Sequence, residues 1–135
     1  MPNLSAQERL ALTEGIMRML DHWGLSAGEV IKILALPGEV RSRQVARYRN
    51  GTPFPDDPQV FKRIEYLIRI ADALRTYFPR NPEMRAIWMR RGNRKFGRKA
   101  PLALMVEGGE SGLIRVLSHL DCTFAWDCTG SKAKY

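Results

Sequence analysis

Apolar residues recur every three or four positions along most of this chain, and that spacing predicts helices rather than strands. In the N-terminal half, Ser5 and Ser26 stand just before such segments, where a serine hydroxyl caps the first backbone N–H groups. Gly24, Pro37-Gly38 and Asn50-Gly51 interrupt the pattern, as helix stops do. We therefore expect helices over residues 6–23, 27–36 and 40–51.

The C-terminal half continues the same periodicity behind stronger start signals. Asp57-Pro58 and Asn81-Pro82 each combine a capping side chain with a proline at the first helical position, which helix starts favour. Pro101 opens another short apolar segment, and Gly108-Gly109 stops it. The expected helices cover residues 58–78, 82–91, 101–108 and 111–126. Because no segment alternates apolar and polar residues, the predicted fold class is all-α.

The net charge of +8 is distributed unevenly along the chain. Residues 1–78 hold 11 basic and 9 acidic residues, whereas residues 79–135 hold 11 basic and 5 acidic residues. Two clusters carry the excess: residues 40–51, with four arginines and no acidic residue, and residues 90–99, with six lysines or arginines. A basic excess indicates an acidic partner, either a nucleic acid or an acidic protein surface.

The first basic cluster lies in a segment that resembles a helix-turn-helix: a short helix, a Pro-Gly turn and a short basic helix. In that motif the second helix lies in the major groove, where arginine matches guanine, glutamine matches adenine, and Arg or Tyr holds phosphate. A solvated helix face explains the same arginines without DNA. The turn is also longer than in the tightest versions, so a start at Ser42 is an alternative. The candidate DNA contacts are Arg41, Ser42, Arg43, Gln44, Arg47, Tyr48 and Arg49.

Groups for catalysis or metal binding are sparse. The chain has two cysteines, Cys122 and Cys128, and no CxxC pair, so a zinc site is not expected and two ordinary thiols are favoured over a disulfide. His119 is interpreted as a helix-surface histidine beside Cys122. No phosphate-binding loop or paired catalytic residues occur, so we expect no enzyme, metal or cofactor. Without a leader or an apolar run near ~18 residues, we expect a cytoplasmic protein and no membrane partner.

The second basic cluster, residues 90–99, is called the basic loop below. It lies within "AIWMRRGNRKFGRKAPLALMVEGGESGLIRVLSHLD", which resembles the toxin-binding domain of the Xre/MbcA/ParS antitoxins. The resemblance covers most of residues 25–121. Gly92 departs from it where proline is common, and Arg98 where a second glycine is common. The matching residues are Trp88, Asn93, Phe96, Gly97, Pro101, Leu102, Met105, Gly108, Val116, Leu120 and Asp121.

The resemblance implies an all-α fold with a dimerising helix-turn-helix region over residues 1–78, a toxin-binding helical domain over 79–128 and a polar tail over 129–135. It implies an antitoxin that blocks a RES-domain toxin, an enzyme that degrades NAD, by covering its NAD pocket with the C-terminal segment. It also implies a homodimer that binds double-stranded operator DNA and represses its own promoter. The alternative is a stand-alone transcription regulator whose C-terminal domain dimerises or senses something else.

A pocket for dinucleotide phosphates is itself basic, so the basic loop should face acidic groups at its margin. The tip "FAWD" should enter instead, with Trp126 as anchor and Asp127 as phosphate mimic. Apolar residues of so small a domain are core more often than contact, so Trp88 and Phe96 keep both interpretations. The candidate toxin contacts are Trp88, Asn93, Arg94, Lys95, Phe96, Arg98, Lys99, Leu120, Asp121, Phe124, Trp126 and Asp127.

Overall fold

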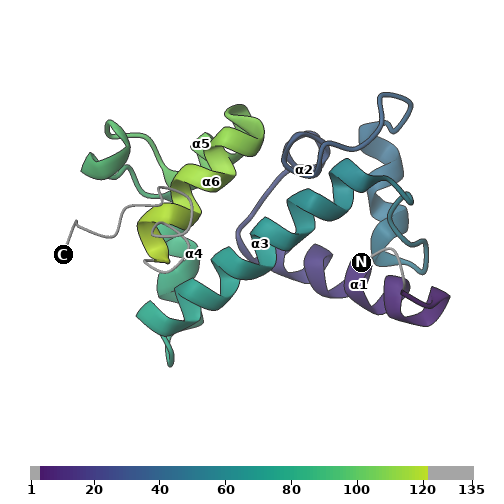
Figure 1. Ribbon diagram of the computed structural model, residues 1–135, viewed down its shortest axis with the longest axis horizontal. Coiled ribbons are helices and arrows are strands. Elements are labelled where there is room, and N and C mark those ends of the chain that lie inside the picture. Colours follow the sequence, from purple (N-terminus) through teal and green to yellow (C-terminus); the bar gives the residue numbers. More distant parts are fainter. Residues whose placement is uncertain (1–3, 122–135) are drawn as a thin grey trace, which may run out of the picture. The chain divides into compact units, whose positions relative to one another are not determined.

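The computed structural model describes residues 4–121, and every regular element in that part of the chain is a helix, which confirms the all-α prediction (Figure 1). The α-helices are α1 (Ala6–His22), α2 (Ala27–Leu34), α3 (Pro58–Tyr77), α4 (Pro82–Arg90), α5 (Pro101–Glu107) and α6 (Gly109–Leu120). Two 3-10 helices, η1 (Ser42–Arg49) and η2 (Arg94–Phe96), complete the order. No helix of residues 4–121 is long and apolar enough to cross a membrane.

The predicted capping residues Ser5, Ser26 and Asn81 accept hydrogen bonds from backbone N–H groups at the starts of α1, α2 and α4. The Ser5 hydroxyl accepts from the Glu8 backbone N–H at 3.1 Å, and the Glu8 carboxylate accepts from the Ser5 N–H at 2.9 Å. That backbone hydrogen bond lowers the pKa of Glu8. Ser26 and Glu29 form the same reciprocal pair at the start of α2. Local sequence therefore fixes both starts, as it does at Asn81, whose side chain accepts from Met84 N–H.

The third predicted helix is shorter and tighter than expected. It is the 3-10 helix η1 and begins at Ser42, which the sequence analysis gave as the alternative start because the preceding turn is long. The backbone of Arg41 is still extended, with its N–H donating to the Gln44 side chain at 2.7 Å, so Arg41 lies before the helix. At the other end, the N–H groups of Asn50 and Thr52 both donate to the Arg47 carbonyl, which closes the helix before Gly51.

Two other helices also end earlier than predicted. α2 stops at Leu34 because Ala35 takes the left-handed conformation, with φ of 53°, ahead of Leu36 and Pro37. α6 stops at Leu120 because the backbone of Asp121 is extended. The stretch from residue 122 to 126, which the prediction added to that helix, lies outside the described residues.

The chain forms two compact units, Met1–Glu65 and Tyr66–Tyr135, and α3 contributes its first part to one and its second part to the other. The domain boundary that the sequence predicts after residue 78 stays a prediction. The buried apolar residues of the N-terminal unit are Ile16, Met17, Leu20, Trp23, Leu25, Val30, Ile33, Leu34, Leu36, Val45, Tyr48, Phe54, Val60, Phe61 and Ile64. Those of the C-terminal unit are Leu67, Ile70, Leu74, Met89, Phe96, Leu102, Met105, Val106, Leu113, Val116, Leu117 and Leu120.

A buried threonine organises the N-terminal unit. The Thr13 hydroxyl accepts from the Phe54 N–H at 2.9 Å and donates to the Arg9 carbonyl at 2.9 Å. The Arg9 guanidinium donates in turn to the Phe54 carbonyl at 3.3 Å. These bonds satisfy the backbone of the proline-rich loop before α3, which forms no regular structure of its own, and attach it to α1.

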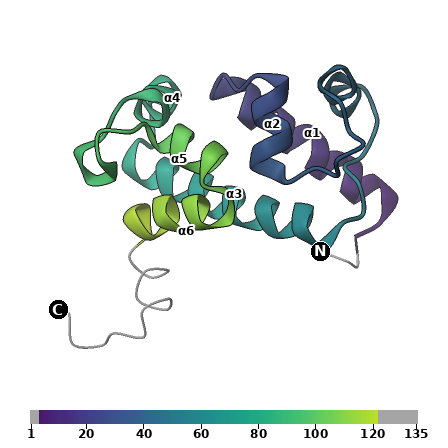
Figure 2. The ribbon, with the colours of Figure 1, turned by 90° about the horizontal axis from the view of Figure 1, so that it is seen from above.

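In the C-terminal unit, α5 and α6 pack side by side at very short range (Figure 2). Gly112 on α6 is buried, and a Cβ atom built there would overlap the backbone carbonyl of Leu104 on α5. A Cβ at Gly108 would lie 2.6 Å from the same carbonyl oxygen. Glycine is therefore required at Gly112 by helix-to-helix contact, since its neighbour is backbone and has no rotamer to change.

We predict that Gly112→Ala lowers the free energy of unfolding by about 2 kcal/mol or more, because the added methyl group forces α5 and α6 apart. Gly15→Ala is the matched control, since nothing lies within 4 Å of a Cβ built at Gly15, inside α1. It should raise stability by about 0.5–1 kcal/mol through helix propensity. Denaturant unfolding followed by circular dichroism measures both, and equal effects of the two substitutions would contradict the close packing.

Candidate functional site

Asn93 is the centre of hydrogen bonding in the basic loop. Its side-chain oxygen accepts from the Lys95 N–H at 2.9 Å and caps η2. Its backbone carbonyl accepts from the N–H groups of Phe96 and Arg98, each at 2.9 Å, and its own N–H donates to the Lys99 carbonyl at 3.1 Å. These bonds close the loop on itself, so its basic side chains project from a defined backbone.

The two departures from the family pattern face each other across this loop. Arg98 has a φ of 68°, the left-handed region that glycine adopts without cost and that other residues rarely adopt. A Cβ built at Gly92 would lie 2.6 Å from the Arg98 carbonyl oxygen. With arginine in this strained conformation at 98, only glycine fits at 92 without a shift of the loop.

Phe96 fixes the loop to the helices around it. Its ring is buried, with 3% of its surface exposed, and meets Trp88 of α4 edge-on at 6.3 Å between ring centroids. His119 of α6 meets the same ring edge-on at 5.2 Å and lies nearly parallel to Trp88. The Arg115 guanidinium sits 5.7 Å from the Phe96 centroid, a cation–π distance. Together these four residues are called the Phe96 cluster.

His119 thus lies in the Phe96 cluster, half-buried, and the prediction of a simple surface histidine is incomplete. Burial lowers its pKa, and the positive charge of Lys95 lowers it further. Both effects favour the neutral imidazole, which packs against Trp88 and Phe96 without adding charge beneath a loop that is already basic. His119 and Arg115 were not among the predicted site residues, although their i, i+4 spacing on an amphipathic helix gives them a shared face.

The predicted toxin contacts separate by exposure. Trp88, Asn93 and Asp121 are half-buried, and Asp121 pairs with Arg69 of α3 at 3.5 Å. Phe96 and Leu120 are core residues. Phe124, Trp126 and Asp127 lie outside the described residues, as do Cys122 and Cys128. The exposed members are Arg94, Lys95, Arg98 and Lys99.

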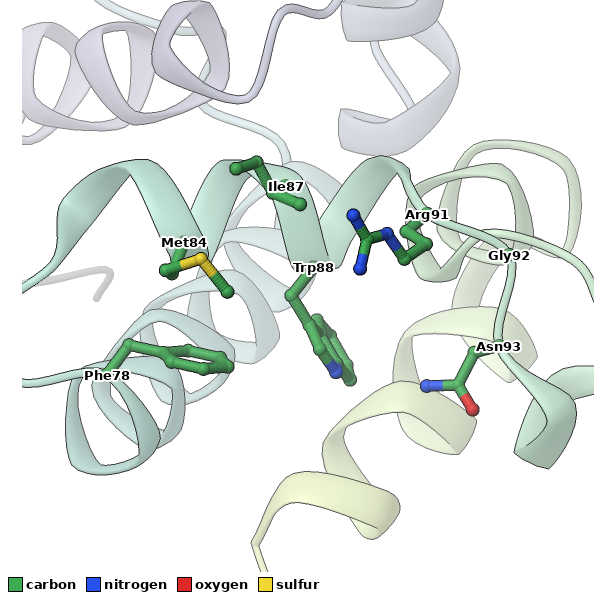
Figure 3. A pocket seen from close by; sticks show the side chains of 7 residues that line it. All are labelled: Phe78, Met84, Ile87, Trp88, Arg91, Gly92 and Asn93. Atoms are coloured by element: carbon green, nitrogen blue, oxygen red, sulfur yellow. The ribbon is translucent and has the colours of Figure 1, made fainter.

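A small pocket of about 90 Å³ opens beside the basic loop, along α4 (Figure 3). Met84 and Trp88 project from the same side of α4, toward Phe78 at the end of α3, while Ile87 points away from them. Asn93 and Gly92 of the basic loop lie at the far side of Trp88, and Arg91 extends from the end of α4. Sequence reasoning did not single out Phe78, Met84 or Ile87 as site residues, because each fits the apolar stripe of a helix.

In the N-terminal unit, η1 presents the other basic surface. Arg41, Ser42, Arg43 and Arg47 are exposed. Within residues 4–121, no carboxylate pairs with any of these three arginines. The four side chains are therefore available to an outside partner.

The remaining predicted DNA contacts have structural partners. Tyr48 is buried and packs its ring on Phe54, 5.0 Å between centroids, and burial raises the pKa of its hydroxyl. Arg49 makes two hydrogen bonds to Asp21 of α1, at 2.6 and 2.8 Å, which lower the pKa of Asp21. The Gln44 side chain accepts from the Arg41 N–H. The Tyr48 and Arg49 contacts hold η1 against the rest of its unit, whereas the Gln44 contact caps the start of η1 itself.

Comparison with known proteins matches the C-terminal unit to a defined domain. The family model described as the antitoxin Xre/MbcA/ParS C-terminal toxin-binding domain matches residues 73–122. That range contains the basic loop, the Phe96 cluster and all the residues that line the Figure 3 pocket. A protein of Sinorhizobium fredii (strain NBRC 101917 / NGR234), described as uncharacterized protein y4oB, is 35% identical over 109 residues, 80% of this chain and 80% of that protein.

The family match assigns a role to this unit. Loop, cluster and pocket all belong to a toxin-binding domain, so the protein is the antitoxin of a toxin–antitoxin system. The chain belongs to the Xre/MbcA/ParS antitoxin family.

Proposed function

We propose that this antitoxin neutralises a RES-domain toxin, an enzyme that degrades NAD, by covering the toxin's active-site pocket. The observation that carries the proposal is the match to a toxin-binding domain at residues 73–122. That domain contains the basic loop, whose cations are exposed while its one aromatic residue, Phe96, is buried. Arg94, Lys95, Arg98 and Lys99 face acidic groups at the margin of the toxin's pocket. The tip that enters the pocket is residues 124–127, with Trp126 as anchor and Asp127 as phosphate mimic.

We also propose that the chain binds double-stranded operator DNA through η1 and represses its own promoter as a homodimer in the cytoplasm. Arg41, Ser42, Arg43 and Arg47 support this, because they are exposed on one short basic element. In this proposal Arg43 reads a base edge and Arg47 holds a phosphate. Tyr48, Arg49 and Gln44 serve by keeping η1 in position. The chain itself catalyses nothing and needs no cofactor.

The competing function is a stand-alone transcription regulator. The two functions differ in whether the chain acts on a toxin protein. An antitoxin restores growth and NAD in cells that produce its toxin, whereas a regulator of unrelated promoters does neither. DNA binding is common to both and does not discriminate.

We predict that the product of the gene adjacent to this chain's own depletes cellular NAD when expressed alone, and that co-expression of this chain restores NAD and growth. The double variant Trp126→Ala, Asp127→Ala should fail to restore either, because it removes both groups proposed to enter the pocket. Lys132→Ala, Lys134→Ala in the same tail is the control and should rescue like the parent chain. Intact rescue by the Trp126–Asp127 variant would exclude the tip as the blocking segment.

We predict that Arg43→Ala relaxes sequence preference at one base pair of a fragment from the chain's own promoter, a cost of about 1–3 kcal/mol. Arg47→Ala should weaken binding to all sequences and reduce the slope of log affinity against log salt by about one. Arg18→Ala, an exposed arginine of α1, is the control and should change neither quantity. Fluorescence anisotropy over a salt series measures all three variants, and unchanged binding by the first two would show that η1 does not contact DNA.

A further inference from the structure

The pocket along α4 lies within the toxin-binding domain, and its lining includes none of the four predicted toxin contacts that are exposed, Arg94, Lys95, Arg98 and Lys99. Its apolar lining comes from Phe78, Met84, Ile87 and Trp88. The two large apolar side chains that are most exposed in the described part of the chain are Tyr77 at 55% and Ile87 at 41%. Ile87 lines the pocket, and the Tyr77 ring lies 6.5 Å from Phe78. Exposed apolar surface therefore gathers here, a feature of interaction sites.

The size of the pocket limits what it can hold. Pockets for small molecules and cofactors measure about 300–1,000 Å³, several times the volume of about 90 Å³ found here. One apolar side chain of a partner protein is the occupant of suitable size. A single side chain anchored in a small apolar pocket is also how interface hot spots are built.

The charge at the pocket edge selects the chemistry of that partner. None of the seven lining residues is acidic, and Arg91 at the edge is exposed and has no carboxylate partner within residues 4–121. In Figure 3 its guanidinium group lies beside the α4 side chains, above Trp88. The basic loop continues from it with four more exposed cations. A partner that seats an apolar side chain here must therefore bring negative charge to this edge.

We propose that this pocket is a second contact with the toxin: one apolar side chain of the toxin enters between Phe78, Met84 and Trp88, and an adjacent carboxylate binds Arg91. The proposal rests on the proposed function for the identity of the partner. This pocket contact differs from the proposed blocking of the active site, because it binds the toxin's surface elsewhere and contributes to the affinity of the antitoxin for the toxin. Trp88 joins the two contacts, since one part of its ring packs in the Phe96 cluster and another lines the pocket.

The test measures binding of the full chain to the adjacent gene's product by calorimetry. Arg91→Glu reverses an exposed charge and leaves the core untouched, and it should weaken binding about tenfold or more. Met84→Glu places a carboxylate in the apolar lining and should do the same. Arg18→Glu, with the same charge change on α1, is the matched control and should bind within about twofold of the parent chain. A thermal melt of each variant verifies folding, and if Met84→Glu is unfolded, Arg91→Glu decides.

A benzophenone amino acid in place of Ile87, an exposed residue at the margin of the pocket, captures a partner that docks over the pocket. It should cross-link to a toxin peptide that contains an acidic residue, whereas the same group in place of exposed Glu107 should not. If both charge variants bind like the parent chain, or if the cross-link forms to a second copy of this chain, the pocket contact is wrong. The proposed function still stands in that case, provided that the parent chain neutralises the toxin. If the parent chain itself does not bind the adjacent gene's product, the proposed function fails and the pocket contact fails with it.

Discussion

The burial of one phenylalanine ring holds the basic loop of this antitoxin in place. Phe96 is the only apolar side chain in the basic loop, and it is inserted between Trp88, His119 and the Arg115 guanidinium. Each aromatic contact of this kind contributes about 0.5–1.5 kcal/mol beyond the area that it buries. Most other hydrogen bonds of the loop lie within it, around Asn93, and the Arg115 side chain of α6 adds one to the Lys95 carbonyl at 3.5 Å, so the ring supplies the apolar part of the attachment.

Additional positive charge next to the basic loop would be unfavourable because the loop is already basic, and the side chains packed under Phe96 are mainly aromatic. Burial lowers the pKa of His119, and the positive charge of Lys95 lowers it further, which favours the uncharged imidazole in this cluster. Three acidic residues of this unit are engaged elsewhere: Asp121 with Arg69, Asp72 with Arg75, and Glu110 with Tyr66. Within residues 4–121, no carboxylate pairs with Arg94, Lys95, Arg98 or Lys99, so the positive charge of the loop is not neutralised locally.

The two basic surfaces follow one design. In each, some of the polar or aromatic residues secure a short 3-10 helix while their neighbours stay exposed. Tyr48 and Arg49 secure η1 through Phe54 and Asp21, and Asn93 and Phe96 secure η2. The residues that hold each element and the residues whose side chains stay exposed are thus different, a few positions apart. A mutation of the first kind disturbs the geometry of the element, whereas a mutation of the second kind changes only its exposed charge.

The sequence by itself determined the helical class, the capped helix starts at Ser5, Ser26 and Asn81, and the family, because caps, periodicity and motif spacing are local properties of the chain. Only the tertiary structure decided which members of each basic cluster are exposed. Arg43 and Arg49 are the same residue type six positions apart, yet only Arg49 meets Asp21, a residue of another helix. Likewise Phe78 and Met84 fit ordinary apolar stripes along the sequence, and only the packing of the chain places them beside a pocket. Contacts between segments distant in sequence leave no periodic signal, so no pattern along the chain could have revealed them.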